Sequence, residues 1–332
     1  MMNVHFFTRK FNPKFVSIEK LFSNIKREFE KKDIHVNLIE EIKEKQPLGF
    51  IKTLFYFRKN QSDINHIIGA IHWSCFLLNR NKTILTIHDL GNYDDIKSFI
   101  KKKLYYLLWI YLPIKRVKYI TVISEKTKED VIKYVPSAKD KISVIHNCLL
   151  IDDNTDVSHI PSDKPVVLAV GYYEKKNLDR ILQAIVGLNV KLILIGQLSE
   201  ERKIFINQNN LDVEENFMCS EDKLYECYRK ANVLCFPSLF EGFGLPILEA
   251  QYFCIPVITS NISPMKDVAG RGALLIDPYS VDEIKKAISR IILDQNLSTE
   301  LIQLGKENLK NYLPEKIADT YLKFYQKVLN KI

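Results

Sequence analysis

The residues best suited to chemistry lie in the stretch Leu234–Ala250, LCFPSLFEGFGLPILEA. Apolar residues before Pro237 predict a short strand, and Pro246 stands where the first turn of a following helix accepts proline. A glycine-containing loop that leads into a helix is suited to an anion such as phosphate, because the first backbone amides of the helix carry a partial positive charge. Glu241 lies in the loop and Glu249 about one turn into the helix. The two carboxylates can therefore contact opposite ends of one extended ligand.

Short apolar runs alternate with longer segments of helical period along the whole chain, which predicts βαβ units and parallel sheets. The fold class is therefore α/β, with two doubly wound, Rossmann-like domains. We expect an N-terminal domain over 1–150, a polar linker over 151–164, a C-terminal domain over 165–315, and a helix over 316–332 that packs back towards the N-terminal domain. Ligands of such sheets bind at the carboxyl ends of the strands, the edge at which Glu241 is expected.

The same periodicities predict the individual elements. Strands are expected near 3–7, 36–39, 66–68, 83–87, 119–123, 142–145, 165–170, 191–195, 214–218, 233–236 and 256–259. Helices are expected near 17–31, 71–78, 96–111, 126–134, 178–188, 201–209, 221–230, 246–253 and 281–293, with two closing helices separated by Pro314.

Composition limits the class of protein. The chain has 332 residues, 46% of them hydrophobic, which is enough for two buried cores. No apolar run is long enough to cross a bilayer, and the first residues do not resemble a secretory signal, so we expect a cytoplasmic protein. Residues 1–150 carry 27 Lys and Arg against 15 Asp and Glu, whereas residues 151–332 carry 21 against 25. The basic half therefore needs an anionic partner or surface. The cysteines suggest neither a disulfide framework nor a zinc site: Cys75, Cys148, Cys219, Cys227, Cys235 and Cys254.

The order of motifs around Glu241 resembles a known family. Pro-Ser, Glu-Gly-x-Gly-x-Pro and Leu-Glu-Ala are followed by IPVITSN at 255–261 and VAGRGALLIDP at 268–278. This order resembles the retaining glycosyltransferases of family 4, and the resemblance runs through nearly all of 165–330. It implies the GT-B fold, in which two Rossmann-like domains face a central cleft.

The resemblance also implies roles for particular residues. Glu241 would touch the hydroxyls of the donor sugar, and Glu249 would hold the ribose of the nucleotide. Lys176 would contact the diphosphate, although a solvated lysine before a helix is the alternative; Tyr172 and Tyr173 stand where many members have an arginine. The further donor-binding residues implied are Gly242, Phe243, Gly244, Leu245, Lys175 and Asn177.

The N-terminal half offers further candidates. His88, in TILTIHDLG at 83–91, ends a predicted strand, and in family members with this His-Asp pair the imidazole lies beside the donor sugar and phosphate. His66 and His72 are placed at another strand end, either lining the acceptor side or serving as core or capping histidines. The loop after the first strand has no glycine but carries Arg9, Lys10 and Lys14, which would either contact an anionic acceptor or form a solvated basic loop.

These features lead to one preferred function. The resemblance implies transfer of a sugar from a UDP- or GDP-sugar to a hydroxyl of a saccharide or lipid-linked saccharide, with retention, in the synthesis of a cell-surface polysaccharide. No Asp-x-Asp sequence occurs in the chain, so we expect neither a metal nor another cofactor. The alternatives are a nucleotide-sugar epimerase of the same fold and a basic nucleic-acid-binding protein. The latter would leave the glycine loop unexplained, and we expect no nucleic acid as a partner.

The segment 96–118, IKSFIKKKLYYLLWIYLPIKRVK, carries seven Lys or Arg and no acidic residue around an apolar run. Such a segment is suited to the interface between lipid headgroups and acyl chains. It predicts a peripheral protein on the inner face of the plasma membrane, held by anionic lipid. The alternative is a buried helix of the first domain with solvated ends.

Overall fold

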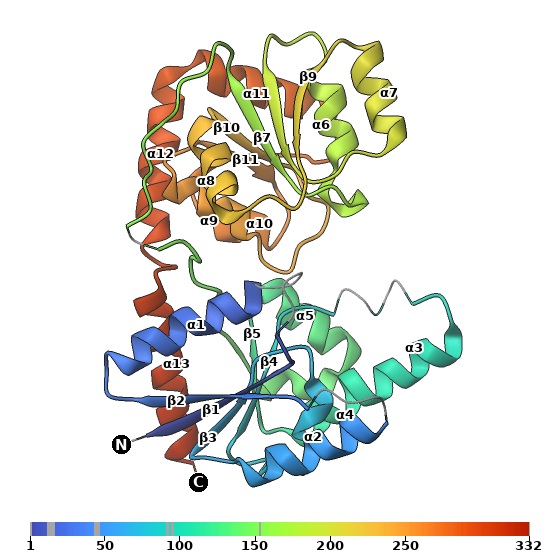
Figure 1. Cartoon of the computed structure of the whole chain (residues 1–332), viewed down its shortest axis with the longest axis vertical. Helices are drawn as coiled ribbons and strands as arrows, with labels where there is room; N and C mark the ends of the chain where they lie inside the picture. Colours follow the sequence, from blue (N-terminus) through green and yellow to red (C-terminus); the bar gives the residue numbers. More distant parts are fainter. Residues whose placement is uncertain are drawn as a thin grey trace. The chain divides into compact units, whose positions relative to one another are not determined.

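The computed structural model describes residues 2–11, 17–42, 47–90, 93, 96–152 and 154–331. They form two compact units (Figure 1). Unit 1 comprises Met1–Leu150 and Leu313–Ile332, and unit 2 comprises Ile151–Tyr312. Each unit contains one six-stranded parallel sheet, so the α/β class is confirmed.

The sheet of unit 1 has the strand order β2-β1-β3-β4-β5-β6. Its strands are β1 (Asn3–Thr8), β2 (His35–Glu40), β3 (Ile64–Ile67), β4 (Thr83–Ile87), β5 (Tyr119–Val122) and β6 (Ile142–Val144). All residues of β3 and β4 are buried, because helices cover both faces of a parallel sheet. The connecting segments are α1 (Ser17–Glu30), α2 (Leu48–Lys59), η1 (His72–Leu77), α3 (Phe99–Tyr105), η2 (Tyr106–Tyr111), α4 (Leu112–Arg116), α5 (Glu125–Tyr134) and η3 (Pro136–Lys141).

The last helix, α13 (Pro314–Leu329), belongs to unit 1 and packs against α1. The ring of Tyr321 lies 5.9 Å from that of Phe22, and the ring of Tyr325 lies 5.7 Å from that of Phe29. The chain therefore starts unit 1, builds unit 2, and returns to complete unit 1.

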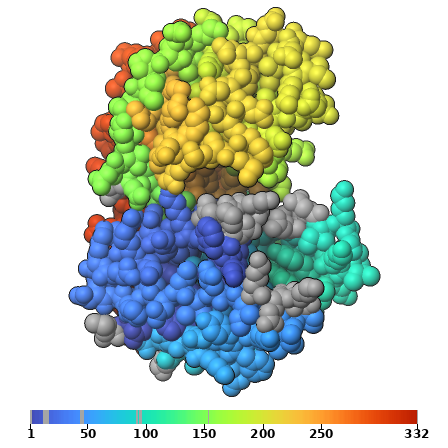
Figure 2. Space-filling model, viewed as in Figure 1, coloured from blue at the N-terminus to red at the C-terminus, as the bar shows by residue number. Residues whose placement is uncertain are grey.

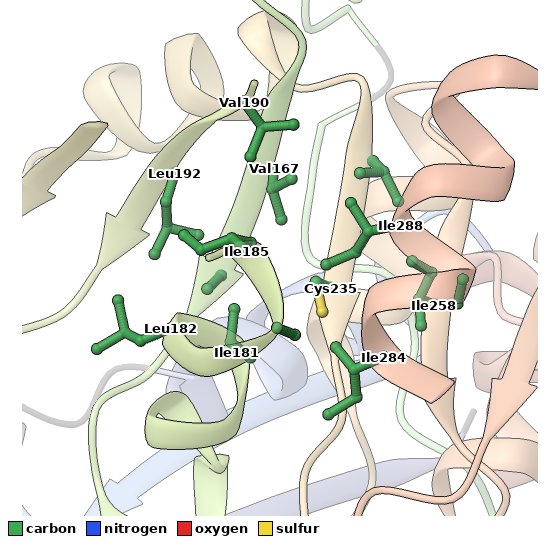
Figure 3. Close-up of a cluster of buried hydrophobic side chains, with 14 of the residues drawn as sticks. Val167, Ile181, Leu182, Ile185, Val190, Leu192, Cys235, Ile258, Ile284 and Ile288 are labelled. Atoms are coloured by element: carbon green, nitrogen blue, oxygen red, sulfur yellow. The ribbon is translucent and has the colours of Figure 1, made fainter. Parts of the chain in front are cut away.

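The sheet of unit 2 has the order β12-β11-β10-β7-β8-β9. Its strands are β7 (Val166–Val170), β8 (Lys191–Ile195), β9 (Asp212–Asn216), β10 (Val233–Phe236), β11 (Val257–Ser260) and β12 (Ala273–Ile276). Apolar side chains of α6 and α11 close the core against β7, β8 and β10 (Figure 3). The connecting segments are η4 (Glu174–Lys176), α6 (Leu178–Ile185), α7 (Glu200–Gln208), α8 (Glu221–Lys230), α9 (Leu245–Tyr252), α10 (Met265–Ala269), α11 (Val281–Leu293) and α12 (Gln295–Leu309).

Most predicted elements are confirmed to within a few residues, and the differences have physical causes. Helix α2, LGFIKTLFYFRK, was missed because apolar residues occupy most of its positions and hide the helical period. Strand β9 was predicted two residues too late, because as an edge strand it exposes the polar sequence DVEEN. The other edge strand, β12, has four residues and was not predicted, and neither was the short helix α10.

Candidate functional site

The strand order of unit 2 reverses between β7 and β10, so the loops after these two strands leave the sheet in opposite directions. Such a switch point is the usual ligand site of an open α/β sheet. The two loops are joined directly: the Leu239 N–H donates to the Lys175 carbonyl oxygen at 2.8 Å. The predicted donor-site residues of both loops are therefore held at one edge of the sheet.

Lys176 and Glu241 form an ion pair across this edge, with 2.7 Å between Nζ and Oε1. Both side chains keep some solvent exposure, 23% for Lys176 and 14% for Glu241. Gly171 allows the lysine to lie there, because its φ is +96° and an added Cβ would come within 2.6 Å of the lysine Cγ. The lysine Nζ also lies 4.8 Å from the ring centroid of Phe236, a cation–π contact.

The glycine loop leads directly into helix α9. Gly244 occupies the N-cap position in a left-handed conformation, φ 111° and ψ 47°, which strongly favours glycine. Glycine has no side chain with which to cap the helix, and Pro246 lies in its first turn as predicted. Phe243 is buried against Tyr312, with 5.9 Å between ring centroids, and thereby anchors the loop to unit 2. An uncapped N-terminus beside a lysine is suited to an anionic ligand.

Glu249 lies in the second turn of α9 and is partly exposed. The buried Tyr228 of α8 donates its hydroxyl to Glu249 Oε2 at 2.5 Å. Burial, and then the negative charge of Glu249, hold the pKa of Tyr228 well above its usual value, so the phenol remains a donor. Its ring stacks on Phe253 at 5.2 Å. Sequence reasoning missed Tyr228, because a buried tyrosine on a helix looks like ordinary core.

His88 follows β4 in unit 1 and keeps partial exposure. Its Nε2 lies 3.0 Å from the Ile68 carbonyl oxygen, which can only accept, so Nε2 carries the proton. Burial lowers the pKa of His88 to about 4, and the ring is therefore neutral near pH 7, with Nδ1 as its acceptor atom. Asp89 beside it is exposed.

The sheet of unit 1 has its own switch point, between β1 and β3. Arg9 follows β1 and pairs with Glu19 of α1, with 2.9 Å between Nε and Oε1. Thr8, the last residue of β1, has a buried hydroxyl with no hydrogen-bond partner in the described part of the chain. At this end of unit 1, Arg9 is thus held by an ion pair and the hydroxyl of Thr8 is buried.

Two family models match the chain, and together they span residues 3–308. "Glycosyltransferase Family 4" matches residues 3–152, and "Glycosyl transferases group 1" matches residues 151–308. The chain belongs to the family 4 type of group 1 glycosyltransferases. This glycosyltransferase also has the GT-B fold that the resemblance implied.

Similar proteins agree with this assignment. The O-antigen chain mannosyltransferase RfbU of Salmonella typhimurium is 30% identical over 234 residues, which cover 68% of this chain and 64% of RfbU, just under two thirds of that relative's length. CapM of Staphylococcus aureus, a capsular polysaccharide biosynthesis glycosyltransferase, is 26% identical over 76% of this chain and 71% of its own. HepE of Anabaena, solved with UDP and glucose, superposes with a TM-score of 0.74 at 13% identity, over 98% of this chain and 100% of HepE.

The geometry corrects one predicted donor-binding residue of this glycosyltransferase. Asn177 is only 3% exposed, and its side-chain amide donates to the carbonyl oxygens of Pro237 at 2.9 Å and Pro278 at 2.6 Å. Its oxygen accepts from Arg180 at 2.8 Å. Asn177 therefore holds three loops together and has no polar atom left for a donor. Lys175 is exposed, with its Nζ 5.2 Å from the ring centroid of Phe240.

His66 and His72 are buried, so the prediction that they line the acceptor side is wrong and the core alternative holds. His66 is completely buried, with Nδ1 2.6 Å from the Tyr325 hydroxyl and Nε2 2.6 Å from the Thr86 hydroxyl. Burial lowers the pKa of His66 to about 3. His72 Nδ1 donates to the Trp109 carbonyl oxygen at 2.8 Å, so this side chain supports the helix beside it.

The remaining predictions for unit 1 have mixed outcomes. Lys10 is exposed, and its backbone N–H lies 3.4 Å from Glu41 Oε1. Lys14 and Gly91 lie outside the described residues. Across the described residues, no group of three or more His, Cys, Asp or Glu side chains is placed to hold a metal ion. No helix there has both the length and the apolar character to cross a bilayer.

Proposed function

We propose that this glycosyltransferase moves a sugar from a UDP- or GDP-sugar to a hydroxyl of a saccharide or lipid-linked saccharide, with retention at the anomeric carbon. The observation that carries the proposal is the Lys176–Glu241 pair at the switch point of unit 2, next to the uncapped N-terminus of α9. A role in building a cell-surface polysaccharide is supported by the printed functions of RfbU and CapM. The UDP in HepE supports a nucleotide-linked donor.

The donor diphosphate competes with Glu241 for Lys176. When a phosphate oxygen takes the ammonium group, the Glu241 carboxylate becomes available to the hydroxyls of the sugar. Glu249, held by Tyr228, accepts from the ribose hydroxyls at the other end of the donor. The glycine loop, with the backbone amides of Phe243, Gly244 and Leu245 at the start of α9, adds its partial positive charge at the phosphates.

The transfer step breaks the bond between the anomeric carbon and the phosphate oxygen and forms a bond to the acceptor oxygen on the same face. The acceptor hydroxyl passes its proton to the departing phosphate. Lys176 and the N-terminus of α9 stabilise the negative charge of that phosphate, so no metal ion is needed. Neutral His88 offers Nδ1 to a hydroxyl of the donor or acceptor. We place this reaction at the inner face of the plasma membrane, where a lipid-linked acceptor would be anchored.

Two substitutions test these roles. Glu249→Ala is expected to weaken the binding of UDP or GDP in calorimetry, because it removes the acceptor for the ribose hydroxyls. Glu241→Ala is expected to leave nucleotide affinity nearly unchanged and to lower kcat with the sugar donor, because it acts on the sugar. Equal losses of nucleotide affinity in both variants, with kcat preserved, would contradict the assignment.

The other functions predict different results. An epimerase converts the nucleotide sugar in the absence of an acceptor, which product analysis detects. A nucleic-acid-binding protein binds DNA or RNA with steep salt dependence and gives no thermal shift with UDP, GDP or ADP.

A further inference from the structure

The segment around α3 is unusually exposed for its composition. Phe99 and Ile100 at its start are 80% and 78% exposed, and no residue of α3 is buried. Leu104 and Leu107 continue this apolar stripe at helical spacing, and both are exposed. Figures 1 and 2 show α3 and the residues leading into it, in teal, at the outer edge of unit 1. For α3 the alternative of a buried helix is therefore wrong, whereas it holds for the part of the segment that follows, where Ile110 and Ile114 are buried in the core of unit 1.

Helix α2 carries a second apolar stripe of the same kind. Leu48, Ile51 and Phe55 are each about half exposed and recur at helical spacing. Both α2 and the η2 segment pack on η1, where Phe50 stacks on Trp73 with 3.9 Å between ring centroids. Together, α2 and the α3–α4 segment supply nine of the twenty large apolar side chains that are exposed in the described chain.

The charged residues within these helices have one sign. The residues of α2, α3, η2 and α4 include Lys and Arg but no Asp or Glu. Lys101, Lys103 and Lys115 are exposed beside the apolar side chains. Tyr105 and Trp109 stack at 5.6 Å and are only partly buried, which suits the level of lipid headgroups. A partner that complements this surface therefore has an apolar interior covered by negatively charged groups.

We propose that α2 and the α3–α4 segment form a docking surface for a bilayer that contains anionic lipids. The exposed phenylalanine and leucine side chains enter the acyl boundary, and the lysines meet the headgroup phosphates. The proposed function explains why the enzyme would need a membrane, and the inference rests on it in this respect alone. His72 donates to the carbonyl of Trp109 in this segment, so the docking surface is joined to the elements that follow β3.

Flotation of the full chain with vesicles tests the proposal. Binding is expected with vesicles of phosphatidylcholine and about one third phosphatidylglycerol, and not with phosphatidylcholine alone. Lys101→Gln/Lys103→Gln is expected to weaken binding about 25-fold, since each lysine near an anionic surface contributes about a fivefold factor. Phe99→Ser/Ile100→Ser should weaken it at least tenfold through lost apolar burial. Leu293→Ser, at an 83% exposed residue of α11, is the matched control and should float normally.

The outcomes separate this inference from the proposed function. Flotation that is independent of anionic lipid, or lost equally in the Leu293 variant, overturns the docking surface. Sedimentation gives a second way to overturn it. If the wild type is a dimer, the Phe99/Ile100 variant is a monomer and neither floats with vesicles, the surface binds a second copy of the chain and not a membrane. If the protein floats as expected but binds no nucleotide, the docking surface is supported and the proposed transferase function is overturned. UDP binding should be unchanged in all three variants.

Discussion

At the scale of single residues, the site contains side chains that hold its other side chains and its loops in place. Tyr228 donates to Glu249 and cannot lose its proton near neutral pH, so this donor holds one oxygen of the carboxylate in place. Asn177 does the same for the loops after β7 and β10.

Removing the Tyr228 hydroxyl should therefore weaken nucleotide binding. Tyr228→Phe keeps the ring that stacks on Phe253 but leaves Glu249 without this donor. We expect UDP or GDP affinity to fall at least about tenfold, because one hydrogen bond to a charged group contributes about 1.5–3 kcal/mol. Calorimetry with UDP and with GDP measures this change in affinity. Tyr106→Phe in unit 1, where the hydroxyl donates to the Tyr134 carbonyl oxygen, is the control and should bind normally.

The buried histidines make unit 1 sensitive to acid. The pKa of His66 is about 3 and that of His88 about 4, both lowered mainly by burial, whereas an unfolded histidine titrates near 6.5. Between pH 6.5 and 4 the unfolded chain therefore binds more protons, and stability falls as the pH falls. Each histidine contributes up to about 1.4 kcal/mol per pH unit to the loss of the free energy of unfolding.

Urea denaturation at pH 7 and pH 5 measures this effect. Trp73 and Trp109, the only two tryptophans, both lie in unit 1, so their fluorescence reports on that unit. His66→Asn should make the pH dependence shallower. An unchanged slope in this variant would mean that His66 is not the group responsible.

At the scale of elements, the break between η2 and α4 has an identifiable cause. Residues Tyr106–Tyr111 form a π-helix, and Pro113 is the second residue after it. Proline has no N–H, so the Trp109 carbonyl oxygen loses the partner that a regular α-helix would supply. The Nδ1–H of His72 takes that place at 2.8 Å.

This substitution of partners can be tested with a double variant. His72→Ala leaves a carbonyl without its donor and should lower the free energy of unfolding by about 1–3 kcal/mol. Adding Pro113→Ala restores a backbone N–H and should recover part of that loss. Urea denaturation followed by circular dichroism measures both changes. Additive losses in the double variant would contradict the explanation.

At the scale of the whole molecule, the chain leaves unit 1 at Leu150 and returns to it at Leu313. Helix α13 buries Ile317, Tyr321, Tyr325 and Val328 in unit 1, and Tyr325 contacts His66 across 259 positions of sequence. Unit 1 is therefore completed only by the last residues described.

Ending the chain after Tyr312 should damage unit 1 selectively. It removes the apolar side chains of α13 and leaves His66 without the Tyr325 hydroxyl. We expect the tryptophan fluorescence transition to move to clearly lower urea, while the thermal shift produced by UDP binding to unit 2 persists. Tyr325→Phe should cause a smaller loss of about 1 kcal/mol. A truncated chain with unchanged fluorescence stability would show that α13 is dispensable.

The sequence by itself determined the alternation of strands and helices and the family, because apolar periodicity and the order of glycine, proline and glutamate residues are local signals. It also predicted that Glu241, Glu249 and Lys176 lie near one edge of the sheet, since the carboxyl ends of parallel strands meet there.

Only the tertiary structure decided which side chains meet. His66 was expected at the acceptor site but lies between Tyr325 and Thr86. Asn177 was expected to contact the donor sugar nucleotide, but its amide donates to two backbone carbonyl oxygens. Tyr228 looked like core but orients Glu249. The exposure of α3 was equally undecided, because the same apolar and basic composition suits a buried helix or a lipid surface. Each of these outcomes depends on partners far away in the chain, and a local pattern carries no record of them.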